Sequence, residues 1–153
     1  MEVGKIAENK IATNDKAPER VIKESTTEII ADGAIFYNPV QEFNRDLSIS
    51  VLNVYSKRLI REREAAAHKN AQNTNESNAN DKKPYTAGVK YDDGLRILEA
   101  FASTGLRSRR YAKEVAGVRE IVANDLFKLA VDSISVNMRH NGVEHLIDIR
   151  INS

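Results

Sequence analysis

One stretch constrains the fold of this chain more than any other, the run from Arg96 to Asp125, RILEAFASTGLRSRRYAKEVAGVREIVAND. Its pattern predicts a strand over 96–100, a loop over 101–105, a helix from Leu106 to near Gly117, and a second strand over 118–123. Apolar strands separated by a helix are typical of a parallel sheet, because parallel neighbours need a crossover connection. We therefore expect an α/β fold.

The loop over 101–105 lies where such a sheet places a ligand. A loop between a strand's carboxyl end and a helix's amino end directs several N–H groups and a positive dipole into one crevice. Gly105 allows the backbone to turn with positive φ and to approach a ligand closely. Asp125 follows at roughly the 20-residue spacing at which an acidic side chain accepts hydrogen bonds from ribose hydroxyls. These residues predict a pocket for a ligand that contains a nucleoside.

The remainder of the carboxy-terminal half continues the alternation of strand and helix. Ala130, Ile134 and Met138 recur at helical spacing before Asn141-Gly142, which is a good helix stop, and a third strand is predicted over 145–151. We expect three parallel strands in the order 3-2-1, which is part of a Rossmann-like sheet. The first strand would then be an open, apolar edge, so we expect an incomplete fold for this chain alone.

The chain before this sheet has a different character. A hairpin is predicted from VIKESTTEII with a turn at Asp32-Gly33, and a helix from the apolar stripe Leu47, Val51, Tyr55 and Leu59. Residues 70–93 contain few aliphatic side chains and predict a disordered insertion. The expected organisation is a disordered leader over 1–20, a hairpin and helix over 21–69, the insertion over 70–93, and the sheet domain over 94–153.

The composition excludes several classes of function. The net charge is +1, from 23 basic and 22 acidic residues, which is not the signature of a generally basic nucleic-acid-binding protein. The chain has no cysteine, and its three histidines do not make a metal site, so we expect no metal. No apolar run approaches the roughly 20 residues of a membrane span, and the amino terminus lacks a signal peptide's apolar core. We expect an intracellular protein without a membrane partner.

Two segments, IFYNPVQEFNRDLSISVL and RILEAFASTGLRSRRYAKEVAGVREIVANDLFKLAVDSISVNMRHNGV, are long and specific. Both resemble the tRNA (guanine(26)-N(2))-dimethyltransferase family, in the family's order and with a variable insertion between them. The resemblance implies a Rossmann-like class I methyltransferase domain that uses S-adenosyl-L-methionine. It also implies that two methyl groups go in turn to the exocyclic amine of a tRNA guanine, with tRNA as partner and the nucleus and mitochondrion as locations.

The resemblance also assigns individual residues. It makes Arg45 in FNRD and Arg107 in TGLR ligands of the cofactor, and Asp125 in AND the acceptor for its ribose. Guanidinium groups clamp a carboxylate, such as that of the cofactor's methionine part, with two parallel hydrogen bonds. Glu99 matches an acidic position in many such methyltransferases and takes a supporting role. Gly105 is the loop's only glycine, which departs from the glycine-rich form of NAD-type sites.

The family's Asp-Pro-aromatic-Gly motif and its tRNA-gripping carboxy-terminal domain do not occur in this sequence. In the family that motif holds the target amine, so we expect no catalytic residue in this chain and no turnover by it alone. A paired base must be flipped out to be reached, and Phe36 and Tyr37 are the candidates to stack on it.

Structural roles compete with these assignments. Asp125 is equally well placed to cap the following helix, Glu99 to cap loop N–H groups, and Phe36 and Tyr37 to lie in the core. Three further cations, Arg109, Arg110 and Lys113, predict a solvated helix face. Two other function classes remain open. The spacing from Gly105 to Asp125 permits a dinucleotide-dependent oxidoreductase, and the open sheet edge is compatible with a non-catalytic truncated product.

Overall fold

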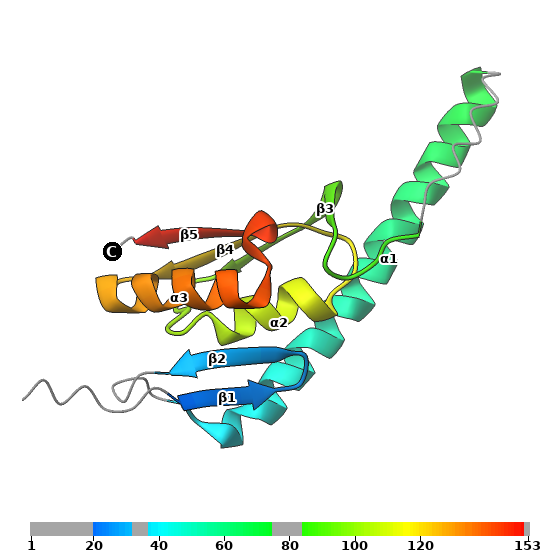
Figure 1. Cartoon of the computed structure of the whole chain (residues 1–153). Helices are drawn as coiled ribbons and strands as arrows, with labels where there is room; N and C mark the ends of the chain where they lie inside the picture. The colour runs from blue at the N-terminus through cyan, green and yellow to red at the C-terminus, as the bar shows by residue number, and fades with distance from the viewer. Residues whose placement is uncertain (1–19, 32–36, 75–83, 152–153) are drawn as a thin grey trace, which may run out of the picture.

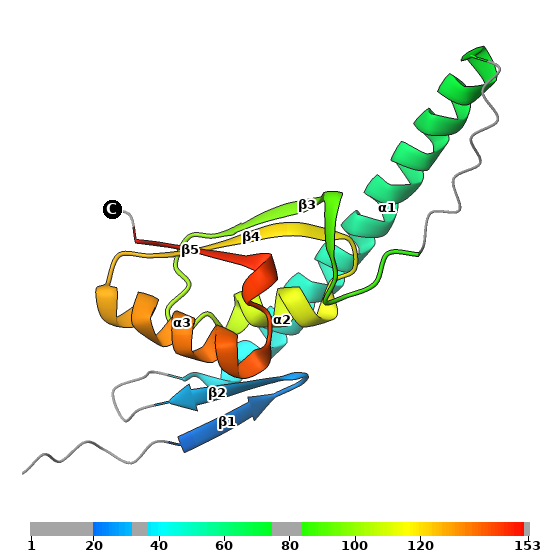
Figure 2. The ribbon, with the colours of Figure 1, turned by 45° about the horizontal axis from the view of Figure 1, so that its top comes forward.

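The computed structural model describes residues 20–31, 37–74 and 84–151, which are arranged in three layers (Figures 1 and 2). A three-stranded sheet forms one layer, two helices pack on it, and a two-stranded hairpin lies on the other side of the helices. The elements in chain order are β1 (Arg20–Glu24), β2 (Thr27–Ala31), η1 (Pro39–Gln41), α1 (Glu42–Thr74), β3 (Lys90–Glu99), α2 (Leu106–Glu114), β4 (Val118–Asp125), α3 (Lys128–Asn141), η2 (Glu144–Leu146) and β5 (Ile147–Ile151).

The sheet has the order β3-β4-β5 with all strands parallel, which confirms the predicted α/β class and the order 3-2-1. Strand β3 begins earlier than predicted because its pairing with β4 continues past an irregularity, where Lys90 and Leu95 both lie opposite Val118. Only glycine fits between them, since a Cβ at Gly94 would come within 2.6 Å of the Arg119 backbone nitrogen.

Helices α2 and α3 cover one face of the sheet and bury its apolar side chains. Ile121 of β4 and Ile134 of α3 are fully buried at the centre of this core, and Met138 is nearly so. The predicted stripe of α3 is confirmed at these two helix positions. Its predicted end is confirmed as well, because Gly142 adopts φ 66° and its N–H caps the last carbonyls of the helix.

The hairpin is confirmed, and its turn lies at Ser25-Thr26 rather than at Asp32-Gly33, which falls outside the described residues. Two asparagines of α3 hold β2 much as a neighbouring strand would. Asn137 accepts a hydrogen bond from the Ile30 N–H at 2.7 Å and donates to its carbonyl at 3.2 Å. Asn141 binds the backbone of Glu28 in the same way, at 3.1 and 2.8 Å.

Helix α1 has 33 residues, which corresponds to about 50 Å, and projects away from the other layers (Figure 1). The apolar stripe predicted to be its buried face is wrong at Leu47, Val51 and Tyr55, which are all more than half exposed. Its fourth member, Leu59, is partly buried against the core. The face of α1 that is buried is a different one, and it is held by polar contacts. Arg45 pairs with Glu24, and the Ser56 hydroxyl donates to the Ala116 carbonyl at 2.6 Å, with Ile49 between them on the same face.

Both ends of the stretch over 70–93 belong to ordered elements. Helix α1 continues to Thr74, and β3 starts at Lys90. Tyr85, which precedes β3, packs on the start of that strand: its ring lies 4.5 Å from the Tyr91 ring, and its hydroxyl donates to Asp93 at 2.6 Å. Residues 75–83 and the leader lie outside the described residues.

Candidate cofactor-binding site

The loop between β3 and α2 turns tightly at the carboxyl edge of the sheet. Ser103 and Gly105 both have positive φ, at 49° and 69°. The Ala102 N–H donates to the Asn124 carbonyl at 2.8 Å, which ties the loop to β4. A Cβ on Gly105 would lie 3.0 Å from Ile134 of α3, so the glycine is needed both for its backbone angle and for close packing.

A hollow of about 200 Å³ opens beside this loop. Tyr37 and Arg45 line it from the amino-terminal module, and Glu99 and Arg107 line it from the sheet and α2, together with the loop residues Phe101 to Thr104. Four of the predicted site residues, far apart in sequence, therefore lie around one hollow. Gly105, the last residue of the loop, and Asp125, the last residue of β4, are not part of the lining, and Phe36 lies outside the described residues.

Arg45 is nearly buried and is held by a protein carboxylate. Its Nε donates to Glu24 Oε1 at 2.6 Å, its Nη2 donates to Oε2, and the Tyr37 ring centre lies 5.6 Å from the guanidinium. A cation in the first turn of a helix calls for a nearby anion, and Glu24 supplies it. In the described part of the chain, Nη1 of Arg45 has no hydrogen bond, so one edge of the guanidinium remains able to donate.

Glu99 lies at the end of β3, where the amino end of α2 meets the sheet. Ser108 donates to it from its hydroxyl and its backbone, and the Arg107 Nε lies 3.9 Å from its carboxylate. Burial raises the pKa of Glu99 to about 7, against the opposing effects of the Ser108 hydrogen bond and the Arg107 charge. The hydrogen bonds to Glu99 therefore come from α2 and not from the loop N–H groups considered for it, and they do not compensate the buried charge.

Asp125 binds two backbone N–H groups, but it does not cap α3, whose N-cap is Phe127 and has no side-chain cap hydrogen bond. Its Oδ1 accepts from the Phe127 N–H at 3.1 Å and its Oδ2 from the Ser103 N–H at 2.8 Å. The carboxylate thereby connects the start of α3 to the loop beside the hollow. Two of the roughly four acceptor positions of a carboxylate are used in this way, which leaves capacity for a ligand.

Tyr37 is half-buried and lines the hollow with its ring. Its hydroxyl donates to Glu24 Oε2 at 3.1 Å, and burial followed by that hydrogen bond raises its pKa. The hydroxyl is therefore engaged in the protein, and the ring is the part that remains available to a ligand.

The expectation that Arg109 and Arg110 form a solvated face is wrong, because both are buried. Arg110 donates to Glu24 at 3.0 Å, to Glu114 at 2.9 Å and to Asp46 at 2.7 Å. Helix α2 packs against several neighbouring elements. Its sequence, LRSRRYAKE, has too few apolar side chains to fill all of these contacts, so charged side chains are buried as well.

Arg109 of α2 is hydrogen-bonded to the loop. Its Nη1 donates to the Thr104 carbonyl at 2.6 Å, and burial lowers its pKa to about 10. Its Nε and Nη2 have no hydrogen-bond partner among the residues that the structure describes. A fully buried arginine with free donors has no sequence signature, so pattern analysis had no means of finding it.

Neither a metal site nor a membrane span is found in the described structure. Within residues 20–31, 37–74 and 84–151, no three His, Cys, Asp or Glu side chains are grouped as metal ligands. The helices in the same ranges are too short or too polar to cross a bilayer.

The fold defines a class of protein: a Rossmann-like α/β domain, with a hollow at the carboxyl edge of its parallel sheet, the edge at which such folds bind ligands. The family model described as N2,N2-dimethylguanosine tRNA methyltransferase matches residues 12–153, and the chain belongs to this family.

Relatives and a solved structure agree with this family. The chain is 54% identical to a tRNA (guanine(26)-N(2))-dimethyltransferase of Drosophila melanogaster, covering 97% of this chain and 27% of the relative. It is 36% identical to the mitochondrial enzyme of that name from Saccharomyces cerevisiae, covering 83% and 25%. Trm1 from Pyrococcus horikoshii, solved with S-adenosyl-L-methionine, has a similar fold, with a TM-score of 0.52 at 21% identity over 80% of this chain and 24% of that one. The chain thus spans about a quarter of these relatives.

Proposed function

We propose that this chain forms the cofactor-binding part of an S-adenosyl-L-methionine-dependent tRNA (guanine(26)-N(2))-dimethyltransferase. Membership of the family supports the reaction class. The observation that carries the proposal is the meeting of Arg45, Glu99 and Arg107 around one hollow at the carboxyl edge of the sheet. Arg45 reaches it from α1, and the other two come from the β3–α2 region.

The charges around the hollow suit the amino-acid end of the proposed cofactor, which carries one carboxylate and one ammonium group. The free edge of Arg45 and the half-exposed Arg107 are donors for the carboxylate. Glu99 is a buried carboxylate with little compensation, so an ammonium group beside it would be stabilised. Asp125, with its remaining acceptor capacity, is proposed for the ribose, and Gly105 for the close turn of the loop next to it.

When bound, the cofactor supplies a methyl group already activated by its positive sulfur. The residues of this chain would hold the amino-acid and ribose ends and so fix the direction in which the methyl group points, which is how positioning contributes to rate. The ring of Tyr37, and Phe36 before it, are proposed to stack on the flipped guanine. We assign no catalytic residue here, because the 153 residues contain no Asp-Pro-aromatic-Gly motif.

The partner in this proposal is tRNA, and the location is the compartment where tRNA is modified, in the nucleus and the mitochondrion. The mitochondrial enzyme from yeast among the relatives supports the second location.

Isothermal titration with S-adenosylhomocysteine tests the cofactor assignment. We expect saturable binding by the full chain, at least tenfold weaker after Arg107→Gln, and unchanged after Lys57→Gln, an exposed position on α1. An affinity of Arg107→Gln equal to that of the wild type and the control would contradict the assignment. A thermal shift with NAD and none with the methyl donor would instead favour the oxidoreductase class.

A further inference from the structure

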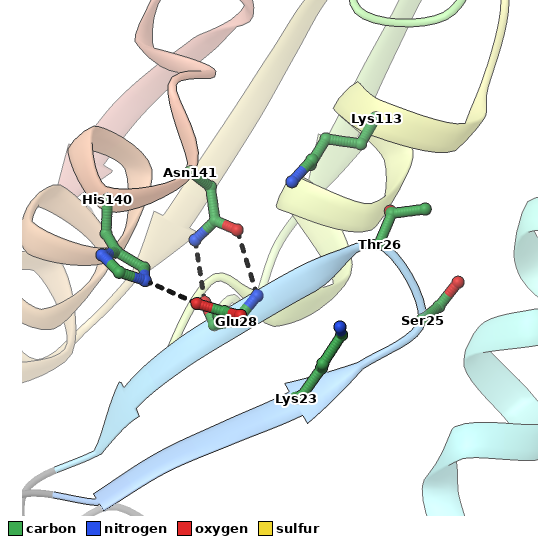
Figure 3. A pocket seen from close by; sticks show the side chains of 7 residues that line it. All are labelled: Lys23, Ser25, Thr26, Glu28, Lys113, His140 and Asn141. Carbon is green, nitrogen blue, oxygen red and sulfur yellow. Dashed lines mark hydrogen bonds and ion pairs between the residues drawn. The ribbon is translucent and has the colours of Figure 1, made fainter.

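A second hollow lies at the opposite end of α2 from the cofactor site. It has a volume of about 350 Å³ and is enclosed by the β1–β2 hairpin and the carboxyl ends of α2 and α3 (Figure 3). All of its lining side chains are polar or charged. This composition excludes an apolar ligand and indicates a small polar or ionic one.

Two lysines give the hollow its character. Lys23 on β1 and Lys113 on α2 extend their ammonium groups into it from opposite sides (Figure 3). Neither ammonium group has a carboxylate partner in the described structure, whereas the two carboxylates nearby both have hydrogen-bond partners. Glu28 lies 3.0 Å from the His140 Nε2, and Glu114 is held by Arg110 and by the Thr26 hydroxyl.

The electrostatic balance favours a singly charged anion. The formal charges of the two lysines and Glu28 leave one positive charge on the lining, with His140 not counted. The carboxyl ends of α2 and α3 oppose an anion through their dipoles, each equivalent to about half a charge. That opposition is reduced because their last carbonyls already accept hydrogen bonds, from Asn53 to Glu114 and from Gly142 to Arg139. The remaining attraction suits a phosphodiester, which carries one negative charge.

We propose that this hollow binds a backbone phosphate of the RNA substrate, which rests on the proposed function. The ammonium groups of Lys23 and Lys113 bind the phosphate oxygens. Helix α2 has nine residues and is about 13 Å long, and the two hollows lie at its opposite ends. An RNA strand whose target base lies near the cofactor site would reach this second hollow within a few nucleotides. Contacts to phosphate fix the register of a nucleic acid without reading its sequence.

Filter binding of a tRNA transcript over a series of salt concentrations tests the proposal. The double variant Lys23→Ala/Lys113→Ala should bind on the order of tenfold more weakly. The slope of log affinity against log salt should fall in magnitude by about 1. The matched control, Lys57→Ala/Lys69→Ala, removes the same charge from the exposed side of α1 and should have little effect.

Three outcomes would overturn the proposal: an equal loss in the control, an unchanged salt slope in the double variant, or no tRNA binding by the unmodified chain. A fourth would be saturable shifts of the Ser25 and Thr26 amide NMR signals with inorganic phosphate but none with a short RNA, which would indicate a site for a free anion. Titration of each variant with S-adenosylhomocysteine reports separately on the proposed cofactor function and should be unaffected.

Discussion

Glu24 and Glu99 are both buried carboxylates near the same hollow, yet their surroundings shift their pKa values in opposite directions. Burial alone would raise the pKa of Glu24, but hydrogen bonds from Arg45, and then Arg110, outweigh it and hold the pKa below its usual value. Glu99 has Ser108 and a guanidinium at 3.9 Å, so burial prevails and raises its pKa to about 7.

The difference separates a structural acid from a candidate binding acid. Glu24 lies between two guanidiniums and joins β1 to α1 and α2, so its acceptor capacity is used within the protein. Glu99 faces the hollow with its charge only partly compensated. A titratable group in this state beside a cavity is typical of a functional site, because a cationic ligand would complete its pairing.

The largest expected effect comes from removing the structural acid. Glu24→Ala leaves Arg45 and Arg110 buried without their shared partner, which should lower the free energy of unfolding by about 3–5 kcal/mol. Urea denaturation followed by circular dichroism measures this. Glu28→Ala on the same hairpin is the matched control, since its pair with His140 is partly exposed and should contribute less than about 1 kcal/mol. Equal losses of stability in the two variants would contradict the distinction between a buried glutamate held by two guanidiniums and a partly exposed one.

Glu99→Gln should act in the opposite direction. Because the pKa of Glu99 is 4.5 in the unfolded chain and about 7 in the folded one, the folded state binds more protons between these values. Stability therefore falls as pH rises through that window, and an uncharged glutamine should stabilise the fold at pH 8 by about 3 kcal/mol. Urea denaturation at pH 5 and pH 8 measures the effect, which should be small at pH 5.

How far the sequence predicted these two regions follows from the range of the interactions. The strand, loop and helix around Glu99 are contiguous, so periodicity and the glycine at 105 located them. Glu24 and Arg110 are brought together by the packing of the hairpin on α2, and no local pattern encodes that contact. For the same reason hydrophobic spacing selected the wrong face of α1, where Arg45 and Ser56 are buried by polar partners contributed from distant segments.

The affinity for S-adenosylhomocysteine should depend on pH through Glu99. If the ligand's ammonium group pairs with the ionised carboxylate, binding must release the proton that Glu99 holds below its pKa of about 7. Affinity should then be constant above pH 8 and fall by up to tenfold for each unit below 7. Isothermal titration at pH 5.5 to 8.5 measures this, and Glu99→Gln should abolish the dependence. A wild-type profile that is flat over this range would exclude Glu99 from the binding site.

Arg107→Lys should have the smallest effect on the fold and still report on the site. The Arg107 side chain is 37% exposed, and its Nε lies 3.9 Å from Glu99, beyond hydrogen-bond distance, so stability should change by less than about 0.5 kcal/mol. Lysine keeps the charge but cannot form two parallel hydrogen bonds to a carboxylate. The affinity for S-adenosylhomocysteine should therefore lie between those of the wild type and Arg107→Gln. Equal affinities of the lysine variant and the wild type would mean that Arg107 acts only as a point charge.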